Sequence, residues 1–321
     1  MAKTIGIVTS GGDAPGMNAA IRAATRIGHC RGFNVLGFER GWDGLLTNCF
    51  KRLGPRSVGG IIHTGGTILH TLRCPAFEQP ESQEIAAQTL SQNNVEALIV
   101  IGGDGSFRGG LELSKRSGVQ IIGIPATIDN DVYGTDETIG FDTAVNTAVG
   151  AIDKIRDTAI SHERIFVVEV MGRKRGFLAL NVGLSVGAEV ILIPEKPLDT
   201  NEVINIMEKN AQKGKHAGII VMAEGAGDSN QLTKDLQKQT ESEVRLSIVG
   251  YAQRGGTPTA RSRLLASLFA EKAIELICEG SGNRAVGLQN GAITSIELER
   301  ATSEKKKIDL RLLQVADMLS A

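Results

Sequence analysis

Residues 119–131 read VQIIGIPATIDND, an apolar run that ends in a proline and is followed by two aspartates. The run is short and rich in β-branched side chains, which is typical of a buried strand. Pro125 should end that strand, so PATIDND forms the turn at its carboxyl end, where open α/β sheets hold their ligands. In this turn Asp129 and Asp131 can face one cleft, with one carboxylate binding a metal and the other accepting a proton. The alternative is that both aspartates cap the next helix.

A second strand and turn lie upstream. The apolar run at 95–101 ends in GGDGS at 102–106, and residues 107–117 can form a crossover helix that Gly118 stops. Strand, turn, helix, strand and turn in this order predict a parallel pair with both turns on one sheet edge. Glycines let phosphate approach backbone N–H groups, but an aspartate there repels bare phosphate unless it holds Mg²⁺. Asp104, together with the aspartates of the PATIDND turn, therefore predicts a phosphoryl-transfer site.

The rest of the chain repeats this alternation of short apolar runs and helical patterns. Further strands are expected at 4–8, 34–38, 165–170, 188–193, 218–222 and 247–251. Helices are expected at 17–27, 82–92, 143–157, 201–213, 235–243, 264–278 and 308–319. The 321 residues suffice for two domains of about 150 residues each, so we expect two α/β lobes.

Composition limits the class of protein. The 35 basic and 36 acidic side chains nearly cancel, which argues against a surface that binds nucleic acid. The four cysteines lack zinc or CxxC spacing, so reduced thiols are expected. No apolar run reaches the length of a membrane span, and the start lacks a signal-peptide pattern. The sequence therefore predicts a soluble cytoplasmic protein without a membrane partner.

The first predicted strand is followed by TSGGDAPG at 9–16, a glycine-rich turn suited to phosphate. It matches neither GxGxxG nor a Walker A loop, so it lacks the fingerprint of a nicotinamide or P-loop protein. Arginine binds phosphate through two parallel hydrogen bonds, and several arginines lie at or near predicted strand ends or glycine-rich turns. They are Arg73, Arg164, Arg173, Arg245 and Arg254. The set fits an anionic substrate, although each member could instead form a surface salt bridge.

Five segments of the chain, in this order and spacing, resemble the bacterial ATP-dependent 6-phosphofructokinases. They are SGGDAPGMNAAIR (10–22), GGDGS (102–106), PATIDND (125–131), ERIFVVEVMGR (163–173) and QRGG (253–256). The resemblance covers nearly the whole chain. It implies two Rossmann-like, three-layer α/β lobes with largely parallel sheets, the smaller inserted in the larger. The implied lobes are a nucleotide-binding one of 1–140 plus 254–304 and a sugar-phosphate-binding one of 141–253 plus 305–321.

The resemblance also implies an activity. The chain would be a glycolytic kinase that transfers the γ-phosphoryl group of ATP to the 1-hydroxyl of fructose 6-phosphate, with Mg²⁺ as cofactor. It would be an allosteric, cytoplasmic homotetramer with sugar-phosphate and effector sites at subunit interfaces. The alternatives are another phosphoryl donor, ADP or pyrophosphate, and a non-catalytic sugar-phosphate sensor. The presence of both Asp104 and Asp129 argues against a sensor, which needs neither a metal ligand nor a base.

Catalytic roles follow from the same resemblance. Asp129 would be the general base that takes the proton of the sugar hydroxyl. Asp104 would bind Mg²⁺, with Asp131 and Thr127 in support. Positive and hydrogen-bonding groups stabilise the charge spread over a transferring phosphoryl group. The residues matched around that group are Gly12, Arg73 and Arg173, with Thr127 completing the catalytic set.

Three binding sets are implied as well. The nucleotide set is Gly12, Arg73, Cys74, Gly102, Gly103, Asp104, Gly105 and Ser106. The substrate set is Thr127, Asp129, Asp131, Met171, Gly172, Arg173, Glu224, Tyr251 and Arg254, with Arg164 and Arg245 reaching the 6-phosphate from a neighbouring subunit. The effector set is Arg22, Arg26, Arg156, Glu189, Lys213 and Lys215. Pro55 and Gly60 depart from the family's effector pattern, so the identity of the effector does not carry over.

The chain departs from the family at other positions too. Tyr251 stands where a histidine is usual in the sugar site. Cys74 and Glu78 replace an aromatic and a basic residue near the nucleotide. Pyrophosphate-dependent relatives carry a lysine in place of Ala126 and an aspartate in place of Gly105. These two small residues leave room for the inner phosphates of a nucleotide, so ATP is the favoured donor.

Overall fold

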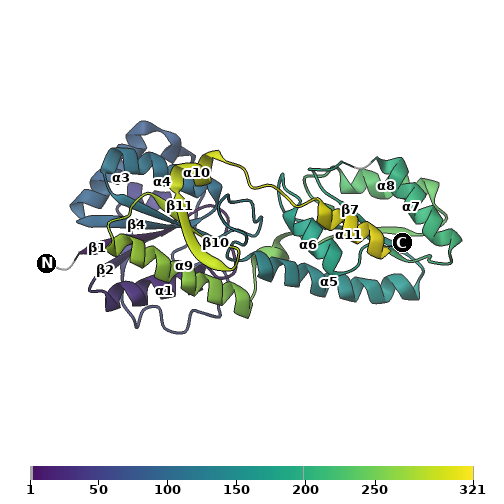
Figure 1. Cartoon of the computed structure of the whole chain (residues 1–321), viewed down its shortest axis with the longest axis horizontal. Helices are drawn as coiled ribbons and strands as arrows, with labels where there is room; N and C mark the ends of the chain where they lie inside the picture. Colours follow the sequence, from purple (N-terminus) through teal and green to yellow (C-terminus); the bar gives the residue numbers. More distant parts are fainter. Residues whose placement is uncertain (1–2, 198, 321) are drawn as a thin grey trace. The chain divides into compact units, whose positions relative to one another are not determined.

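The computed structural model describes residues 3–197 and 199–320, and these form two compact α/β units (Figure 1). Unit 1 consists of Met1–Thr143 and Arg254–Lys306, and unit 2 of Ala144–Gln253 and Lys307–Ala321. The predicted fold class, mixed α/β with largely parallel sheets, is confirmed. Against the expected lobes, the first boundary falls at 143 instead of 140 and the last at 306 instead of 304.

Unit 1 is built on a seven-stranded sheet in the order β11-β10-β5-β4-β1-β2-β3. Its strands are β1 (Thr4–Thr9), β2 (Asn34–Phe38), β3 (Phe50–Leu53), β4 (Val95–Gly102), β5 (Gln120–Pro125), β10 (Arg284–Gln289) and β11 (Ala292–Glu297). β3 and β11 run antiparallel to their neighbours, and the other pairs are parallel. The chain places β2 on one side of β1 and then crosses to β4 on the other. Open α/β sheets bind ligands at the carboxyl edge of such a reversal.

Helices cover both faces of this sheet. α1 (Met17–Cys30) packs with α9 (Ala260–Cys278) on one face, and α3 (Pro80–Gln92) packs with α4 (Asp104–Ser117) on the other (Figure 1). The shorter pieces are α2 (Trp42–Leu46), a 3₁₀ turn at Pro75–Glu78 and α10 (Leu298–Ser303). Because both faces are covered, residues 97–102 of β4 are all buried, which explains the continuous apolar run in the sequence.

Unit 2 is built on four parallel strands in the order β7-β8-β6-β9. They are β6 (Ile165–Val170), β7 (Val190–Leu192), β8 (Gly218–Ala223) and β9 (Val244–Ile248). The helices are α5 (Phe141–Ser161), which begins in unit 1, α6 (Phe177–Ser185), α7 (Thr200–Gln212), α8 (Ser229–Gln239) and α11 (Arg311–Ser320). Residues Gly250–Arg254 form a 3₁₀ turn.

Two predictions are wrong in position. The helix expected at 235–243 is α8, and the strand expected at 247–251 is β9, and both start earlier than expected. α8 starts early because Asp228 accepts hydrogen bonds from two backbone N–H groups of its first turn. β9 starts earlier too and ends before Gly250, whose φ of 55° leaves the extended conformation. Tyr251 therefore lies in a 3₁₀ turn instead of a strand.

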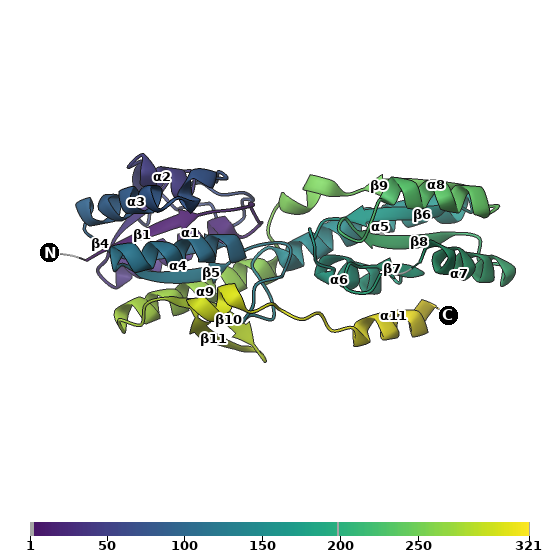
Figure 2. The same cartoon turned by 90° about the horizontal axis from the view of Figure 1, so that it is seen from above.

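Several elements escape prediction from the sequence. α6 is apolar on nearly every side and so lacks a helical period. The β10–β11 hairpin extends the sheet beyond β5 (Figure 2). Asn290 and Gly291 form its turn, both with positive φ, and an Asn-Gly pair is the usual sequence signal for this turn. That signal could have revealed the hairpin.

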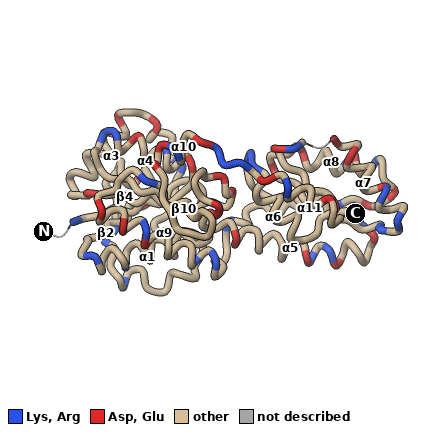
Figure 3. The backbone as a smooth tube through the Cα atoms, in the orientation of Figure 1, with Lys and Arg blue, Asp and Glu red and all other residues tan. Residues whose placement is uncertain are grey.

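Basic and acidic residues are interspersed along the described chain (Figure 3), in agreement with the near-zero net charge. Across residues 3–197 and 199–320, no helix combines the length and the apolar character that crossing a bilayer requires.

Candidate active site

The PATIDND and GGDGS turns lie side by side. β4 and β5 run parallel with Gly102 opposite Pro125, and the N–H of Ala126 donates to the carbonyl of Gly102 at 2.9 Å. A Cβ atom added to Gly103 would lie 3.7 Å from Cβ of Thr127. The predicted parallel pair with both turns on one edge is therefore confirmed.

The first glycine-rich turn joins the same edge from β1. Ser106 Oγ donates to the carbonyl of Ser10 at 2.9 Å, and the N–H of Ser10 donates to the carbonyl of Ile101 at 3.1 Å. Gly11 has a φ of 87°, and a Cβ on Gly102 would lie 2.5 Å from the Ser10 carbonyl oxygen. Glycine permits the positive φ at the first position and the close approach at the second. The turns after β1 and β4 thus pack into a narrow backbone cradle where the strand order reverses.

Asp104 is the first residue of α4, so it lies at a helix N-terminus instead of in the loop expected from the sequence. Its carboxylate pairs with Arg108 one turn along α4, and its side chain is 37% exposed. Helix N-termini favour negative charge such as phosphate. Among residues 3–197 and 199–320, no three His, Cys, Asp or Glu side chains cluster as a metal site. Mg²⁺ needs only one or two carboxylates when bound phosphates supply other ligands, so the partly exposed Asp104 beside the cradle fits this ion.

Asp129 is buried, with 5% of its surface exposed. The alternative in which Asp129 and Asp131 cap the next helix is wrong, because α5 begins ten residues after Asp131. The turn folds back on its own strand instead. The N–H of Thr127 donates to the carbonyl of Ile139 at 3.0 Å, and the hydroxyl of Thr138 donates to the carbonyl of Thr127 at 2.6 Å. Asp129 thus lies on a loop that these hydrogen bonds hold against its own strand.

Two of the arginines singled out in the sequence belong to this edge. A Cβ on Gly12 would lie 3.1 Å from a guanidinium nitrogen of Arg254. The backbone of Arg73 follows two residues after Thr71, whose hydroxyl donates to the carbonyl of Gly11 at 2.8 Å. Arginines beside a glycine cradle suit a ligand with several phosphate oxygens.

The loop before Arg73 is held by Asn18, a buried residue of α1 that sequence reasoning misses. Its Nδ2 atom donates to Thr64 Oγ1 at 2.9 Å and to the Gly65 carbonyl at 3.0 Å. Its Oδ1 atom accepts from the N–H of Ile68 at 2.7 Å. The sequence did contain a signal for this role of Asn18, because it is a polar side chain among the small apolar residues at the start of α1.

Lys306 reaches the loop of Asp129 from the last segment of unit 1. Its ammonium group donates to the carbonyl of Asp136 at 2.9 Å. Burial lowers the pKa of Lys306 to about 8. The carboxylates that oppose this shift are those of Asp136, Asp131 and Glu137. Between about pH 8 and the unfolded lysine value of about 10.4, the unfolded chain binds one more proton than the folded chain, so the free energy of unfolding should rise with pH in this window.

We expect Lys306→Met to remove this pH dependence. Relative to the variant, the wild-type chain should gain about 1–2 kcal/mol in free energy of unfolding between about pH 7.5 and 9.5, since one pKa unit corresponds to about 1.4 kcal/mol and Lys306 is only partly buried. Urea denaturation at the two pH values measures the gain, with the exposed neighbour in Lys307→Met as the control. An equal pH slope for wild type and Lys306→Met would contradict the lowered pKa.

In unit 2, four predicted sugar contacts gather at the carboxyl ends of β6 and β8. Met171, Gly172 and Arg173 follow β6, and Glu224 follows β8. One carboxylate oxygen of Glu224 accepts from the N–H of Gly172 at 3.2 Å and from that of Arg173 at 2.6 Å. Gly172 and Arg173 have φ values of 135° and 52°, so Glu224 stabilises a sharply turned backbone.

Arg164 and Arg245 lie at the opposite, amino edge of this sheet. Arg164 precedes β6, Arg245 is the second residue of β9, and both pair with Glu243. Hydrogen bonding from Arg164 is the main cause that holds the pKa of Glu243 below its usual value. The six residues of β6 separate the two edges by about 20 Å, at about 3.3 Å per residue. Within one chain, these arginines therefore lie far from the turn that Gly172 and Glu224 form.

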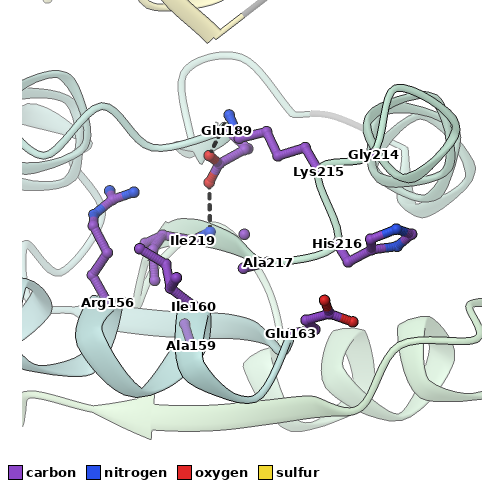
Figure 4. Close-up of a pocket in the computed structure, with 11 residues that line it drawn as sticks. Arg156, Ala159, Ile160, Glu163, Glu189, Gly214, Lys215, His216, Ala217 and Ile219 are labelled. Atoms are coloured by element: carbon purple, nitrogen blue, oxygen red, sulfur yellow. Dashed lines mark hydrogen bonds and ion pairs between the residues drawn. The ribbon is translucent and has the colours of Figure 1, made fainter.

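A pocket of about 350 Å³ in unit 2 contains part of the predicted effector set (Figure 4). The charged or titratable residues that line it are Arg156, Glu163, Glu189, Lys215 and His216. Glu189 is buried, and it binds Lys215 Nζ at 2.7 Å and accepts from the N–H of Ile219 at 2.5 Å. Glu163 and His216 also line the cavity, and the resemblance did not name them.

Other members of the effector set lie outside this pocket. Lys213 follows α7 directly but does not line the cavity. Arg22 and Arg26 belong to α1 of unit 1, where Arg26 donates to the carbonyl of Pro55 at 3.2 Å.

A family model described as phosphofructokinase matches residues 4–277 of the chain. The chain belongs to the phosphofructokinase family. The ATP-dependent 6-phosphofructokinase of Bacillus cytotoxicus is 47% identical over 318 residues, which cover 99% of each chain. ATP-dependent 6-phosphofructokinase 1 of Thermus thermophilus is 47% identical over 320 residues, again with 99% of each chain covered.

Solved phosphofructokinases have the same fold. The phosphofructokinase of Saccharomyces cerevisiae superposes with a TM-score of 0.88 at 33% identity over 99% of this chain, which spans 46% of the length of the yeast chain. A pyrophosphate-dependent phosphofructokinase from Marinobacter aquaeolei has a TM-score of 0.85 at 21% identity, with 96% of this chain and 86% of that one covered. At this identity the second likeness shows the fold alone. The family resemblance in the sequence is thus confirmed.

Proposed function

We propose that this chain transfers the γ-phosphoryl group of ATP to the 1-hydroxyl of fructose 6-phosphate, giving fructose 1,6-bisphosphate and ADP. The observation that carries the proposal is the shared edge of β1, β4 and β5, where a glycine cradle, Asp104 and the loop of Asp129 come from neighbouring strand ends. Two relatives named for this ATP-dependent enzyme, each 47% identical over nearly full length, support the same reaction.

The phosphates of the nucleotide would bind in the cradle. Backbone N–H groups of the turns and the N-terminus of α4 favour negative charge there. Asp104 would hold Mg²⁺ against the phosphates, and its present partner Arg108 would have to release it. Bound Mg²⁺ would neutralise negative charge on the β- and γ-phosphate oxygens. Arg73, held near Gly11 through Thr71, would bind the transferring phosphoryl group.

Asp129 would act as the general base. As the sugar oxygen forms its bond to the γ-phosphorus, the proton of the 1-hydroxyl moves to the carboxylate, and the bond from the γ-phosphorus to the bridging oxygen of ADP breaks. The backbone N–H of Asp129 donates to Thr127 Oγ1 at 3.2 Å, which helps to fix the backbone that carries the carboxylate. Burial keeps bulk water away from this base.

The sugar would bind at the carboxyl edge of the sheet in unit 2. The Glu224-supported turn of Met171, Gly172 and Arg173 would contact its hydroxyls, together with Tyr251. Tyr251 is 79% exposed, so its hydroxyl is accessible to a ligand or to a second copy of the chain. The Tyr251 hydroxyl can donate or accept a hydrogen bond, as a histidine could, but unlike a histidine it cannot supply a positive charge.

We also propose that the active form is a homotetramer. Arg164 and Arg245 lie about 20 Å from the Gly172 turn within one chain, so they would serve the 6-phosphate of a neighbouring copy. Arg254 would bind the same phosphate from its own chain. Light scattering at assay concentrations should give four chains per particle, and full activity in a monomer would exclude this arrangement.

We expect the enzyme to act in the cytoplasm.

The Glu189 pocket is the proposed effector site. Lys215 is paired with a buried carboxylate, and Arg156 lines the same cavity, so a phosphate group can compete for these cations. Phosphate-bearing ligands should therefore bind more tightly than unphosphorylated nucleosides.

Lys215→Met should weaken the binding of such ligands by about tenfold or more, which is about 1.4 kcal/mol. Isothermal titration with ADP and phosphoenolpyruvate measures the change, and citrate serves as an anion without phosphate. Lys209→Met, at an exposed position in the last turn of α7, is the control. Binding of unphosphorylated nucleosides alone would refute the proposed site.

A coupled assay with fructose 6-phosphate and a panel of ATP, ADP, GTP and pyrophosphate tests the main proposal. ATP should support the fastest turnover, because a Cβ on Gly105 would meet no atom within 4 Å, which leaves space for a nucleotide's inner phosphates. If only pyrophosphate supports turnover, the phosphoryl donor is pyrophosphate and not ATP. Binding of fructose 6-phosphate without turnover on any donor would favour the sensor.

A further inference from the structure

Asn130 is a buried polar residue to which the proposed mechanism gives no role. It stands between Asp129 and Asp131, only 4% of its surface is exposed, and its φ is 51°. Residues other than glycine rarely adopt this left-handed conformation, and asparagine tolerates it better than most. The turn that carries the two aspartates is therefore built around this one residue.

Both ends of the Asn130 amide are used. Oδ1 accepts from the backbone N–H of Thr138 at 3.1 Å, and Nδ2 donates to the carbonyl of Asp136 at 3.2 Å. A side chain that must accept and donate at once can be an amide but not a carboxylate. These two bonds tie the middle of the PATIDND turn to the returning segment at 136–138.

That segment is itself anchored from outside the turn. The N–H of Asp136 donates to the carbonyl of Leu288 at 2.7 Å, and its carboxylate accepts from the N–H of Asn290 at 2.8 Å. Lys306 donates to the Asp136 carbonyl that also receives the bond from Asn130. The β10–β11 hairpin and Lys306 thus hold Asp136, and Asn130 links Asp136 to the two aspartates.

We infer that Asn130 is a positioning residue for phosphoryl transfer, which fixes the turn between Asp129 and Asp131 against Asp136 and Thr138. This inference rests on the proposed function, because it assigns Asn130 to the geometry of the proposed base. A misplacement of about 1 Å at a reacting group can cost about 10²-fold in rate. Loss of the two amide bonds should therefore lower kcat much more than it weakens the binding of either substrate.

Two variants separate these effects. Asn130→Gly accepts the left-handed backbone and removes both bonds, so kcat should fall about 10- to 10²-fold while KM for ATP and for fructose 6-phosphate changes less than about threefold. Asn130→Asp keeps the size but turns an acceptor toward the Asp136 carbonyl, and kcat should fall similarly. Hydrogen exchange of the Thr138 amide should be faster in Asn130→Gly than in wild type.

Asn283 offers a matched control in the same unit. It also has a left-handed backbone, with a φ of 56°, and its Oδ1 accepts from the N–H of Ile121 at 3.3 Å near the amino end of β5. Asn283→Gly and Asn283→Asp should keep near-normal kcat. A kcat within about threefold of wild type in both Asn130 variants, or an equal loss in the Asn283 variants, would overturn the inference.

Two further outcomes complete the test. If both Asn130 variants fail to fold while the Asn283 variants fold, Asn130 is structural only and the inference is wrong. If wild type transfers phosphate to fructose 6-phosphate from none of the donors, the proposed function fails by itself, whatever the Thr138 exchange rates of the Asn130 variants.

Discussion

Asp129→Ala is expected to lower kcat by about 10²- to 10⁴-fold or more, the range for loss of a general base. Asp129 is 5% exposed and lies on a loop held by Thr127 and Thr138, so bulk water cannot take the place of its carboxylate as an ordered proton acceptor. Because the proposed base contributes mainly in the transition state, KM for both substrates should change far less than kcat. Steady-state kinetics with saturating MgATP and fructose 6-phosphate measures the loss.

The matched variant for this experiment is Asp129→Asn, which keeps the shape of the side chain but cannot take a proton. It should be impaired as strongly as Asp129→Ala, and thermal unfolding should show that both variants remain folded. Asp153→Asn, at an exposed position on α5, controls for the loss of one negative charge. Near-normal turnover in either Asp129 variant would contradict the role of base.

Buried parallel strands are the part of the fold that the sequence predicts best. β2 occupies the expected residues 34–38, and the expected runs at 95–101 and 165–170 became β4 and β6 with at most one residue added. Because both faces of these strands are covered, their residues form continuous apolar runs without a polar alternation, and such runs are easy to find in the sequence. The turns that follow them are visible for the same reason, since glycine and aspartate interrupt those runs abruptly.

Edge elements are poorly predicted because their partners define them. β3 reads FKRL, with only its last residue buried, and it becomes a strand by pairing antiparallel with β2. α6 is apolar on nearly every side, so no amphipathic stripe marks it. The β10–β11 hairpin had a local signal in Asn290-Gly291, but its value to the site lies in its contact with the Asp136 segment 150 or so residues away.

The site shows the same division between local and long-range information. The turns with Asp104 and Asp129 are readable from strand ends, and their shared edge follows from strand direction. The contacts that hold them are not readable, because Ser106 and Ser10 are 96 residues apart and Asn130 bonds across a loop whose path depends on the hairpin. Arg164 and Arg245 lie at the edge opposite the Gly172 turn, a consequence of strand polarity that residue type alone does not reveal.

The second large effect is expected for Gly102→Ala at the end of β4. An added Cβ would lie 2.5 Å from the Ser10 carbonyl oxygen and 2.5 Å from Ser106 Oγ, so the turns after β1 and β4 must separate by about 1 Å to reach ordinary contact. That displacement would widen the cradle proposed to bind the nucleotide phosphates. kcat/KM for ATP should fall by about 10²-fold, with an overpacking cost of about 1–3 kcal/mol in the free energy of unfolding.

Gly150→Ala is the control for a glycine-to-alanine change, because a Cβ at this position of α5 meets no atom within 4 Å. It should leave activity unchanged and slightly stabilise the helix. Unaltered use of ATP by Gly102→Ala would mean that the cradle is not where the phosphates bind.

The added methyl group of Gly102→Ala would lie within 3 Å of three atoms, which are the Ser10 carbonyl oxygen, Ser106 Oγ and, at 2.8 Å, Ser106 Cβ. Ser106→Ala in the Gly102→Ala background removes the Oγ contact but leaves two others. They are the contact with Cβ of residue 106 and the contact with the Ser10 carbonyl oxygen, which is backbone fixed between β1 and the bond from the Ser10 N–H to Ile101. The double variant should therefore recover little of the lost kcat/KM for ATP. Recovery to the level of Ser106→Ala alone would show that the backbone of the first turn can yield, and the narrow cradle would then be no requirement for phosphate binding.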